Sequence, residues 1–203
     1  MSGERRSPVA AALLVSYVAV AWSLVAGSIS IVVGLQSRST ALVGTGADVL
    51  ADMASSVVLV WRFRTGLHGG RPGHEVERRA HLVASFALLC VAVGVAAGSI
   101  AHLAAGQGAK PDAAGVTVAA ASVLVLPTLA MIKLRIAAAV PSRALRTDAV
   151  ITLVGAATAV LSLLGLVLTR TLHWWAADPG AALGIAVLAA ATSIRELRSR
   201  NED

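Results

Sequence analysis

The sequence predicts an all-α membrane protein with six transmembrane helices, and two observations carry this prediction. Of the 203 residues, 57% are hydrophobic and only 14% are charged, with a mean hydropathy of +0.78. This apolar content far exceeds that of an ordinary soluble domain. The apolar residues also fall into blocks of about twenty, the length that an α-helix needs to cross roughly 30 Å of hydrocarbon.

The apolar blocks follow one another along the chain. They lie at about 10–34, 40–62, 81–105, 113–136, 144–170 and 179–194. The first follows the basic start Glu4-Arg5-Arg6, as a signal peptide would, but its apolar run of about 25 residues is too long for one, so we expect an uncleaved span. We therefore divide the chain into an N-terminal tail (1–9), a six-helix domain (10–194) and a short charged tail (195–203).

Individual residues add detail to the later helices. GxxxG patterns at 94–98 and 180–184 favour close packing of the third and sixth helices, although such patterns are also frequent by chance in spans rich in Gly and Ala. Pro127 predicts a kink in the fourth helix. Asp178 and Pro179 predict the start of the sixth, with the aspartate as N-cap and the proline at the first helical position.

The net charge of +6 follows the predicted membrane topology, so we expect no nucleic-acid partner. With the amino terminus inside, the cytoplasmic segments hold fourteen of the seventeen Lys and Arg residues, Lys133 among them, and only Arg38, Lys110 and Arg170 lie outside. This positive-inside bias predicts that both termini are cytoplasmic. We expect a multi-pass protein that lies in the lipid bilayer of a bacterial plasma membrane.

Two carboxylates lie where the second span should cross the membrane. Asp48 and Asp52, in GTGADVLADMASS, are four residues apart and so share one helix face, one turn apart. Each ionised Asp at the centre of a span opposes insertion by roughly 2.5–3.5 kcal/mol. Hydrogen bonds from Ser55 or Ser56 would explain one aspartate better than two, and no Lys or Arg is expected near mid-span. The sequence therefore favours a bound cation or a proton as their partner.

A third carboxylate, Asp148, lies about one turn inside the fifth span, and Thr152 follows on the same face. Two interpretations of Asp148 stay open. An Asp in the first turn of a helix is favoured by the helix dipole and can pair with Arg143 or Arg146, or Asp148 could join the aspartates of the second helix. In straight helix geometry Asp148 lies about 10 Å nearer the cytoplasm than Gly155 does.

With these residues in view, the chain resembles the transmembrane domain of the cation diffusion facilitator family, also called cation efflux proteins. The resemblance runs from about Leu14 to Arg198. It rests on TALVGTGADVLADMASSVVLVWRFR, GRPGHEVERRA, PSRALRTDAVITLVGAATAVLSLLG and WWAADPGAALGIAVLAA. Members have six spans with both termini cytoplasmic, usually dimerise, and exchange a divalent metal for protons. The resemblance implies a cation-efflux-like bundle, here without the C-terminal cytoplasmic domain common in the family.

The family's metal ligands carry over only in part. Its acidic or histidine pair in the second helix falls on Asp48 and Asp52, whereas its His and Asp in the fifth helix fall on Ile151 and Gly155. Neither of these can bind a metal through its side chain. The predicted site is therefore made of oxygen donors, with a histidine of the cytoplasmic loop matching a second metal site of the family. The residues are Asp48, Asp52, Asp148 and Thr152 for the main site and His74 for the loop site.

The resemblance implies a divalent metal efflux transporter, proton-coupled and homodimeric, in which the metal is the substrate and no cofactor is needed. Oxygen ligands suit Mn or Mg better than Zn. The alternative is a non-transporting structural or heteromeric membrane partner that has kept the fold and lost metal binding, which Ile151 and Gly155 favour. We expect no enzyme, because no nucleophile with an adjacent base is evident in the sequence.

Overall fold

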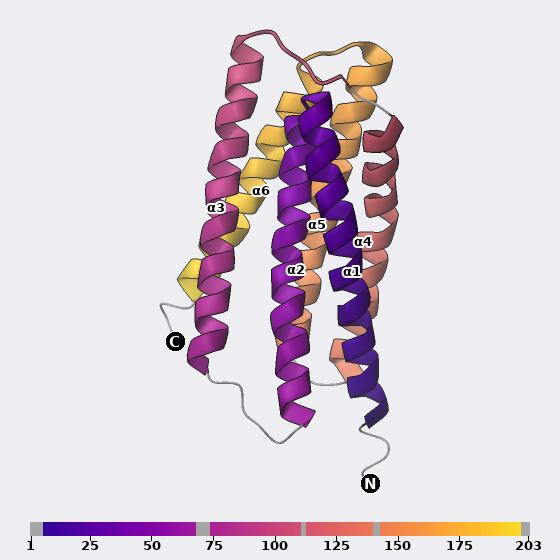
Figure 1. Ribbon diagram of the computed structural model, residues 1–203, viewed down its shortest axis with the longest axis vertical. Coiled ribbons are helices and arrows are strands. Elements are labelled where there is room, and N and C mark those ends of the chain that lie inside the picture. The colour runs from indigo at the N-terminus through magenta and orange to yellow at the C-terminus, as the bar shows by residue number, and fades with distance from the viewer. Residues whose placement is uncertain (1–5, 68–73, 111–112, 140–142, 200–203) are drawn as a thin grey trace.

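The computed structural model describes residues 6–67, 74–110, 113–139 and 143–199, and this part of the chain is a bundle of long helices. The helices are α1 (Arg6–Ser37), α2 (Thr40–Leu67), α3 (His74–Ala104), α4 (Ala113–Ala139), α5 (Arg143–Leu172) and α6 (Ala177–Ser199). They run alternately up and down, so both termini lie toward the same end of the bundle (Figure 1). We call this the terminal end.

Within the described residues, every helix except α3 holds a stretch that is long and apolar enough to cross a membrane. Five candidate spans lie in the described residues: Ala10–Ser37, Thr40–Trp61, Ala113–Ala139, Leu145–Leu172 and Ala177–Arg195. The described apolar part of α3, Leu88–Ala104, is shorter. Several helices extend beyond the predicted spans because the backbone hydrogen bonds continue past the apolar residues.

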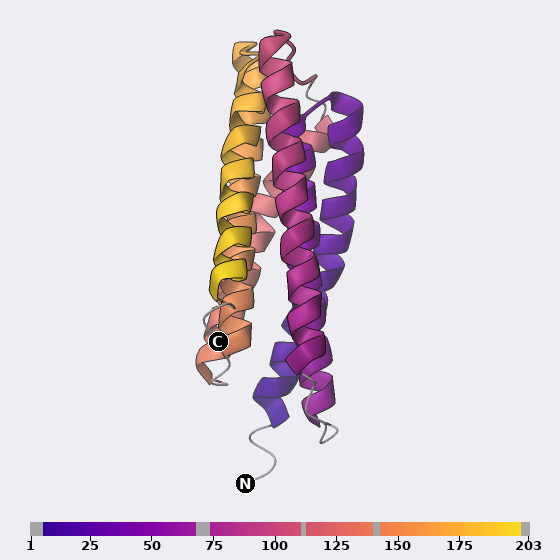
Figure 2. The same cartoon turned by 90° about the vertical axis from the view of Figure 1, so that its left-hand side faces the viewer.

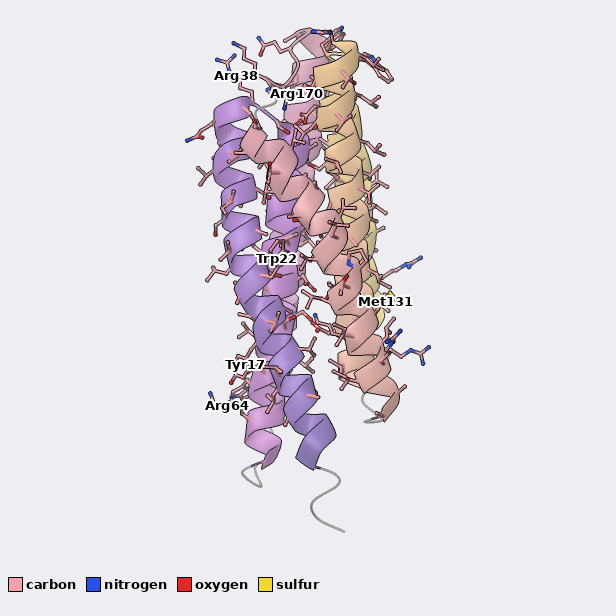
Figure 3. The ribbon with its side chains drawn as sticks, turned by 90° about the vertical axis from the view of Figure 1, so that its right-hand side faces the viewer. Tyr17, Trp22, Arg38, Arg64, Met131 and Arg170 are labelled. Carbon is pink, nitrogen blue, oxygen red and sulfur yellow. The ribbon has the colours of Figure 1, made fainter. Side chains whose placement is uncertain are left out.

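The charged residues at the two ends follow the predicted arrangement. Arg38 and Arg170 lie at one end of the bundle and Arg64 lies at the other (Figure 3). These three arginines therefore lie at the ends to which the predicted topology assigns them. The cytoplasmic placement of the terminal end stays a prediction.

The arrangement of the helices leaves α2 and α5 in the middle of the bundle. Helix α2 packs against α1, α3, α5 and α6, and α5 packs against α2, α4 and α6. Helices α3 and α6 lie side by side on one flank (Figure 2), and α1 and α4 pack together elsewhere. Side chains between α2 and α5 are therefore shielded from lipid by the other helices.

A close contact between glycines sets how α2 faces its neighbours. A Cβ added at Gly46 would lie 2.8 Å from the carbonyl oxygen of Gly27 on α1, so the two backbones can approach this closely only because both residues lack a side chain. Residues advance by about 100° around a helix. Asp48, two residues after Gly46, is therefore turned to the far side of α2, toward α5.

The predicted packing of α3 against α6 is confirmed, but the GxxxG glycines do not make the contact. Nothing lies within 4 Å of a Cβ added at Gly94 or Gly180. Aliphatic side chains fill the interface instead, including Val95 from α3 and Ala182 and Ile185 from α6. Glycines mediate close contacts elsewhere, between α1 and α2 and between α5 and α6, where a Cβ added at Gly165 would lie 2.9 Å from Cβ of Ala181.

Asp178 stabilises a different helix from the one predicted. Helix α6 begins at Ala177, and the buried carboxylate of Asp178 accepts hydrogen bonds from the Ser39 hydroxyl and from the backbone N–H of Ala41 at 3.5 Å. Ser39 in turn accepts a hydrogen bond from the N–H of Leu42. The N-cap assignment to α6 was therefore wrong: Asp178 lies at the positive end of the α2 dipole and fixes the start of the helix that carries the aspartate pair.

Candidate cation site

The polar centre of the bundle is built by the antiparallel pair α2 and α5. Side-chain hydrogen bonds join the two helices at three successive levels. From the middle of the bundle toward the terminal end, these run from Thr158 to Asp48 (2.9 Å), from Thr152 to Asp52 (3.1 Å) and from Ser56 to Asp148 (3.1 Å). Residues one turn apart on α2 thus meet α5 residues that are six and four positions apart, which is why three carboxylates from two helices share one interior region.

All three carboxylates are buried as predicted. Asp48 is 6% exposed, Asp52 is 3% exposed and Asp148 is 2% exposed. Asp148 turns toward α2, where the hydroxyls of Ser55 and Ser56 donate to its Oδ1. Asp148 thus lies in the same polar cluster as the aspartates of the second helix, and its role as a cation ligand stays a prediction. The predicted axial offset is real, since Asp148 lies level with Ser56, one turn beyond Asp52.

Lys133 of α4 lies inside this polar cluster, and the sequence-based expectation for it was wrong. Its side chain is 0% exposed, and its Nζ lies 2.6 Å from Oδ2 of Asp148 in a salt bridge. A buried cation is therefore present in the cluster, near the end of α4 rather than at mid-span, where the sequence had assigned Lys133 to a cytoplasmic segment. Lys133 is also not a cytoplasmic topology residue, because α4 continues to Ala139 and turns this side chain inward.

The burial of Lys133 follows from the face of α4 on which it lies. The buried residues of this helix recur at intervals of three or four, the spacing of one helix face. They are Gly115, Val118, Ala119, Ser122, Leu126, Leu129, Ala130 and Lys133. Lys133 continues a row of small and apolar residues that faces the bundle interior, and this explains its burial. The sequence gives no signal for it, because exposed positions of α4 such as Leu124 and Ile132 are apolar as well.

The ammonium group of Lys133 has a full set of partners. Besides Asp148, its Nζ donates to Oγ1 of Thr152 at 2.8 Å and to Oγ of Ser56 at 3.2 Å. A lysine ammonium has three N–H donors, and three acceptors surround this one. Thr152 also bonds to Asp52, so Lys133 reaches the aspartate pair only through a hydroxyl group.

Asp48 and Asp52 differ from Asp148 in how their charge is compensated. Asp148 has an ammonium partner and two hydroxyl donors. Within the described part of the chain, Asp48 accepts a side-chain hydrogen bond from Thr158 alone and Asp52 from Thr152 alone, and neither forms a salt bridge with a described residue. With all four groups ionised the cluster carries a net charge of −2, and that surplus belongs to the α2 pair.

The position that the resemblance assigns to a ligand on α5 does face the α2 pair. A Cβ added at Gly155 would lie 3.7 Å from Oδ2 of Asp48, which is ordinary van der Waals contact. The carried-over register is therefore consistent with the geometry, although Gly155 offers no ligand atom. Ile151, the other carried-over position, is half-buried.

The other predicted ligands do not complete a preformed metal-binding site within the described residues. Among the described residues, no group of three or more His, Cys, Asp or Glu side chains has the geometry of a metal site. His74 is the first residue of α3 rather than a residue of the preceding loop, and its side chain lies outside the described residues. A cation at the α2 pair would therefore be bound by two carboxylates, with hydroxyl groups and water in the other positions.

The chain matches a known family of membrane proteins over most of its length. The family model described as the Cation efflux transmembrane domain matches residues 16–201. The chain belongs to the cation efflux family. The match confirms the resemblance to cation efflux proteins that the sequence indicated. No curated protein matched the chain.

Family membership fixes the broad class of the protein. Members of the cation efflux family are transporters of metal cations and not enzymes. The matched transmembrane domain and the five long apolar helices make this chain an integral membrane protein. Ionisable residues inside membrane spans are rare and are candidates for function, so the buried aspartates of α2 are the candidate site of this chain.

Proposed function

We propose that this protein transports a divalent metal cation across the membrane and that Asp48 and Asp52 bind the cation. The observation that carries the proposal is a pair of buried carboxylates, one turn apart on α2, that form no salt bridge within the described residues. Two uncompensated charges in a bilayer interior are costly. One divalent cation compensates both.

The donor set supports a hard cation as substrate. The pair offers carboxylate oxygens, and the nearest side chains on α5 offer the hydroxyl oxygens of Thr152 and Thr158. Oxygen donors suit Mn²⁺ or Mg²⁺ better than Zn²⁺, which favours nitrogen and sulfur ligands. Asp148 belongs to the same cluster but is already engaged by Lys133, so the proposal gives the primary contacts to Asp48 and Asp52.

The proposal extends to proton-coupled antiport by a homodimer, with efflux as the direction. A buried carboxylate that releases a metal cation is expected to take up a proton, because its neutral form is better tolerated away from water. The dimer and the direction of transport rest on what the family resemblance implies.

Replacing Asp52 with Asn tests the proposal, because Asn keeps the shape of the side chain and removes the charge. In proteoliposomes under a pH gradient, we expect the initial rate of Mn²⁺ uptake to fall on the order of tenfold or more. A matched control is Thr128→Val on α4, whose exposed hydroxyl bonds only to its own helix in the described structure and whose loss should leave uptake unchanged. Uptake by the Asp52→Asn protein at the wild-type rate would refute the proposal.

A second candidate function is a non-transporting membrane partner that has kept the fold. Two observations favour it: Lys133 already neutralises Asp148, and Gly155 brings no ligand to Asp48. Under this function, reconstituted wild-type protein would carry none of Mn²⁺, Zn²⁺, Co²⁺, Cd²⁺ or Mg²⁺, and the aspartates would be protonated packing groups. Uptake of any of these ions that depends on Asp52 decides between the two candidates in favour of transport.

A further inference from the structure

We infer that Lys133 is a built-in cation that occupies the α5 side of the polar cluster and thereby sets how tightly a divalent cation binds to Asp48 and Asp52. The inference rests on the proposed function, because it concerns the same pair of carboxylates. Its basis is the placement of a fixed positive charge between α4, α2 and α5, with 0% exposure.

The first step is that Lys133 removes Asp148 from the set of available ligands. One oxygen of the Asp148 carboxylate lies 2.6 Å from the ammonium, and the other accepts from Ser55 at 3.0 Å and Ser56 at 3.1 Å. A metal cation that bound Asp148 would have to displace the ammonium and would then lie against a like charge. Such a displacement leaves a buried ammonium without its counter-ion, which is strongly unfavourable.

The second step concerns Thr152, whose hydroxyl oxygen receives a hydrogen bond from Lys133 at 2.8 Å. The same hydroxyl lies 3.1 Å from Oδ1 of Asp52. The hydrogen of this hydroxyl lies between Asp52 and the backbone carbonyl oxygen of Asp148, which is 3.0 Å away. Because Lys133 already engages one of the two lone pairs of the hydroxyl oxygen, a metal on the Asp52 side has to compete with the ammonium for Thr152. Lys133 thus holds both residues of α5 that the sequence suggested as ligands.

The third step is the effect of the charge itself. A fixed ammonium one hydroxyl group away from Asp52 repels a divalent cation, and this repulsion is poorly screened in the bundle interior. Lys133 therefore lowers the cation affinity of the α2 pair in two ways, by repulsion and by withholding Asp148 and Thr152. A transporter benefits from such a device, because a substrate that binds too tightly is not released.

Charge-changing variants of Lys133 test the inference through the dissociation constant for Mn²⁺, measured by calorimetric titration of the purified full chain. Lys133→Met keeps the length of the side chain and removes the charge, and we expect it to bind Mn²⁺ about tenfold tighter or more. Lys133→Arg keeps the charge and should bind as the wild type does. Lys133→Met combined with Asp148→Asn restores the net charge and should return the affinity to within about threefold of wild type.

A control and a second variant keep the test decisive. Arg135→Gln removes a positive charge from the exposed side of α4, two residues away, and should leave the affinity unchanged. If Lys133→Met does not fold, Lys133→Gln makes the same comparison, because its amide can still donate to Asp148 without carrying a charge.

The outcomes separate this inference from the proposed function. Mn²⁺ affinity in Lys133→Met that equals or falls below that of wild type would overturn the role of Lys133, while loss of binding in Asp48→Asn plus Asp52→Asn would still support the proposed function. Tight binding in Lys133→Met with none in wild type would support the inference and contradict transport by the native chain. Tighter binding that persists after both aspartates of α2 are replaced would overturn the inference.

Discussion

Replacing Asp148 with Asn is expected to destabilise the protein by about 3–5 kcal/mol, because it leaves the ammonium of Lys133 buried without its counter-ion. The salt bridge is enclosed on both sides, with side-chain exposures of 0% for Lys133 and 2% for Asp148. The Asn side chain has nearly the same shape and can still accept hydrogen bonds from Ser55 and Ser56, so the difference in stability reports the removal of the charge alone. Unfolding of the purified protein by increasing denaturant in detergent micelles measures this difference.

The matched control for this prediction removes both charges. A chain that carries Lys133→Met together with Asp148→Asn should lie within about 1–2 kcal/mol of wild type, because a neutral pair of similar volume often replaces a buried salt bridge at little cost. The exposed substitution Arg135→Gln should have an effect of about 0.5 kcal/mol or less. A single Asp148→Asn chain as stable as the double variant would show that Lys133 and Asp148 do not depend on each other.

Replacing Gly155 with Asp is expected to raise the affinity for a divalent cation on the order of a hundredfold. A Cβ at this position makes only ordinary contacts, at 3.7 Å from Asp48 and from Leu126, so the new side chain can begin without a steric clash. A third carboxylate beside the α2 pair adds to the attraction for a charge of +2, and cation sites are tuned by the number of charged ligands. Calorimetric titration with Mn²⁺ measures the change.

The isosteric variant Gly155→Asn separates charge from shape in this prediction. It should bind Mn²⁺ at most about tenfold more tightly than wild type, because an amide oxygen is a ligand without a net charge. Without a cation, Gly155→Asp should be the less stable of the two variants, since its carboxylate lies against that of Asp48. Equal affinities for the Asp and Asn variants would contradict the assignment of position 155 to the cation site.

The sequence predicts the six helices and the aspartate pair because each depends on local information. Apolar blocks of sufficient length predict helices in a membrane, and a spacing of four predicts that Asp48 and Asp52 share a face. Both predictions depend only on residues within a single helix. The structure adds the partner of each carboxylate, which depends on how α2 and α5 are aligned.

Lys133 shows why the rest of the site was missed. A hydropathy window averages over all faces of a helix, so one lysine near the end of an apolar stretch is assigned to the loop. Helix α4 is apolar on its exposed face as well, at Leu124, Met131 and Ile132, so the sequence does not distinguish an inward from an outward lysine there. The partners Ser56 and Thr152 lie 77 and 19 residues away in sequence, and no local pattern connects them.

The predictions for the GxxxG glycines and for Asp178 as an N-cap were wrong for a related reason. GxxxG predicts that a helix can approach another closely but not which one, and here Gly46 meets Gly27 while Gly94 faces open space. An aspartate caps its own helix when no other donors compete for its carboxylate. Here the Ser39 hydroxyl and the Ala41 N–H, at the start of α2, donate to Asp178 instead. In both cases tertiary contacts decide between options that are equal in sequence.

The most direct test of the account is the number of Mn²⁺ ions bound per chain, counted by equilibrium dialysis with electron paramagnetic resonance of the free ion. Wild-type protein should bind about one ion at the α2 pair, and a chain that carries both Asp48→Asn and Asp52→Asn should bind none there under the same conditions. Equal binding by the two proteins, or no binding by the wild type, would contradict the claim that these aspartates hold the transported cation.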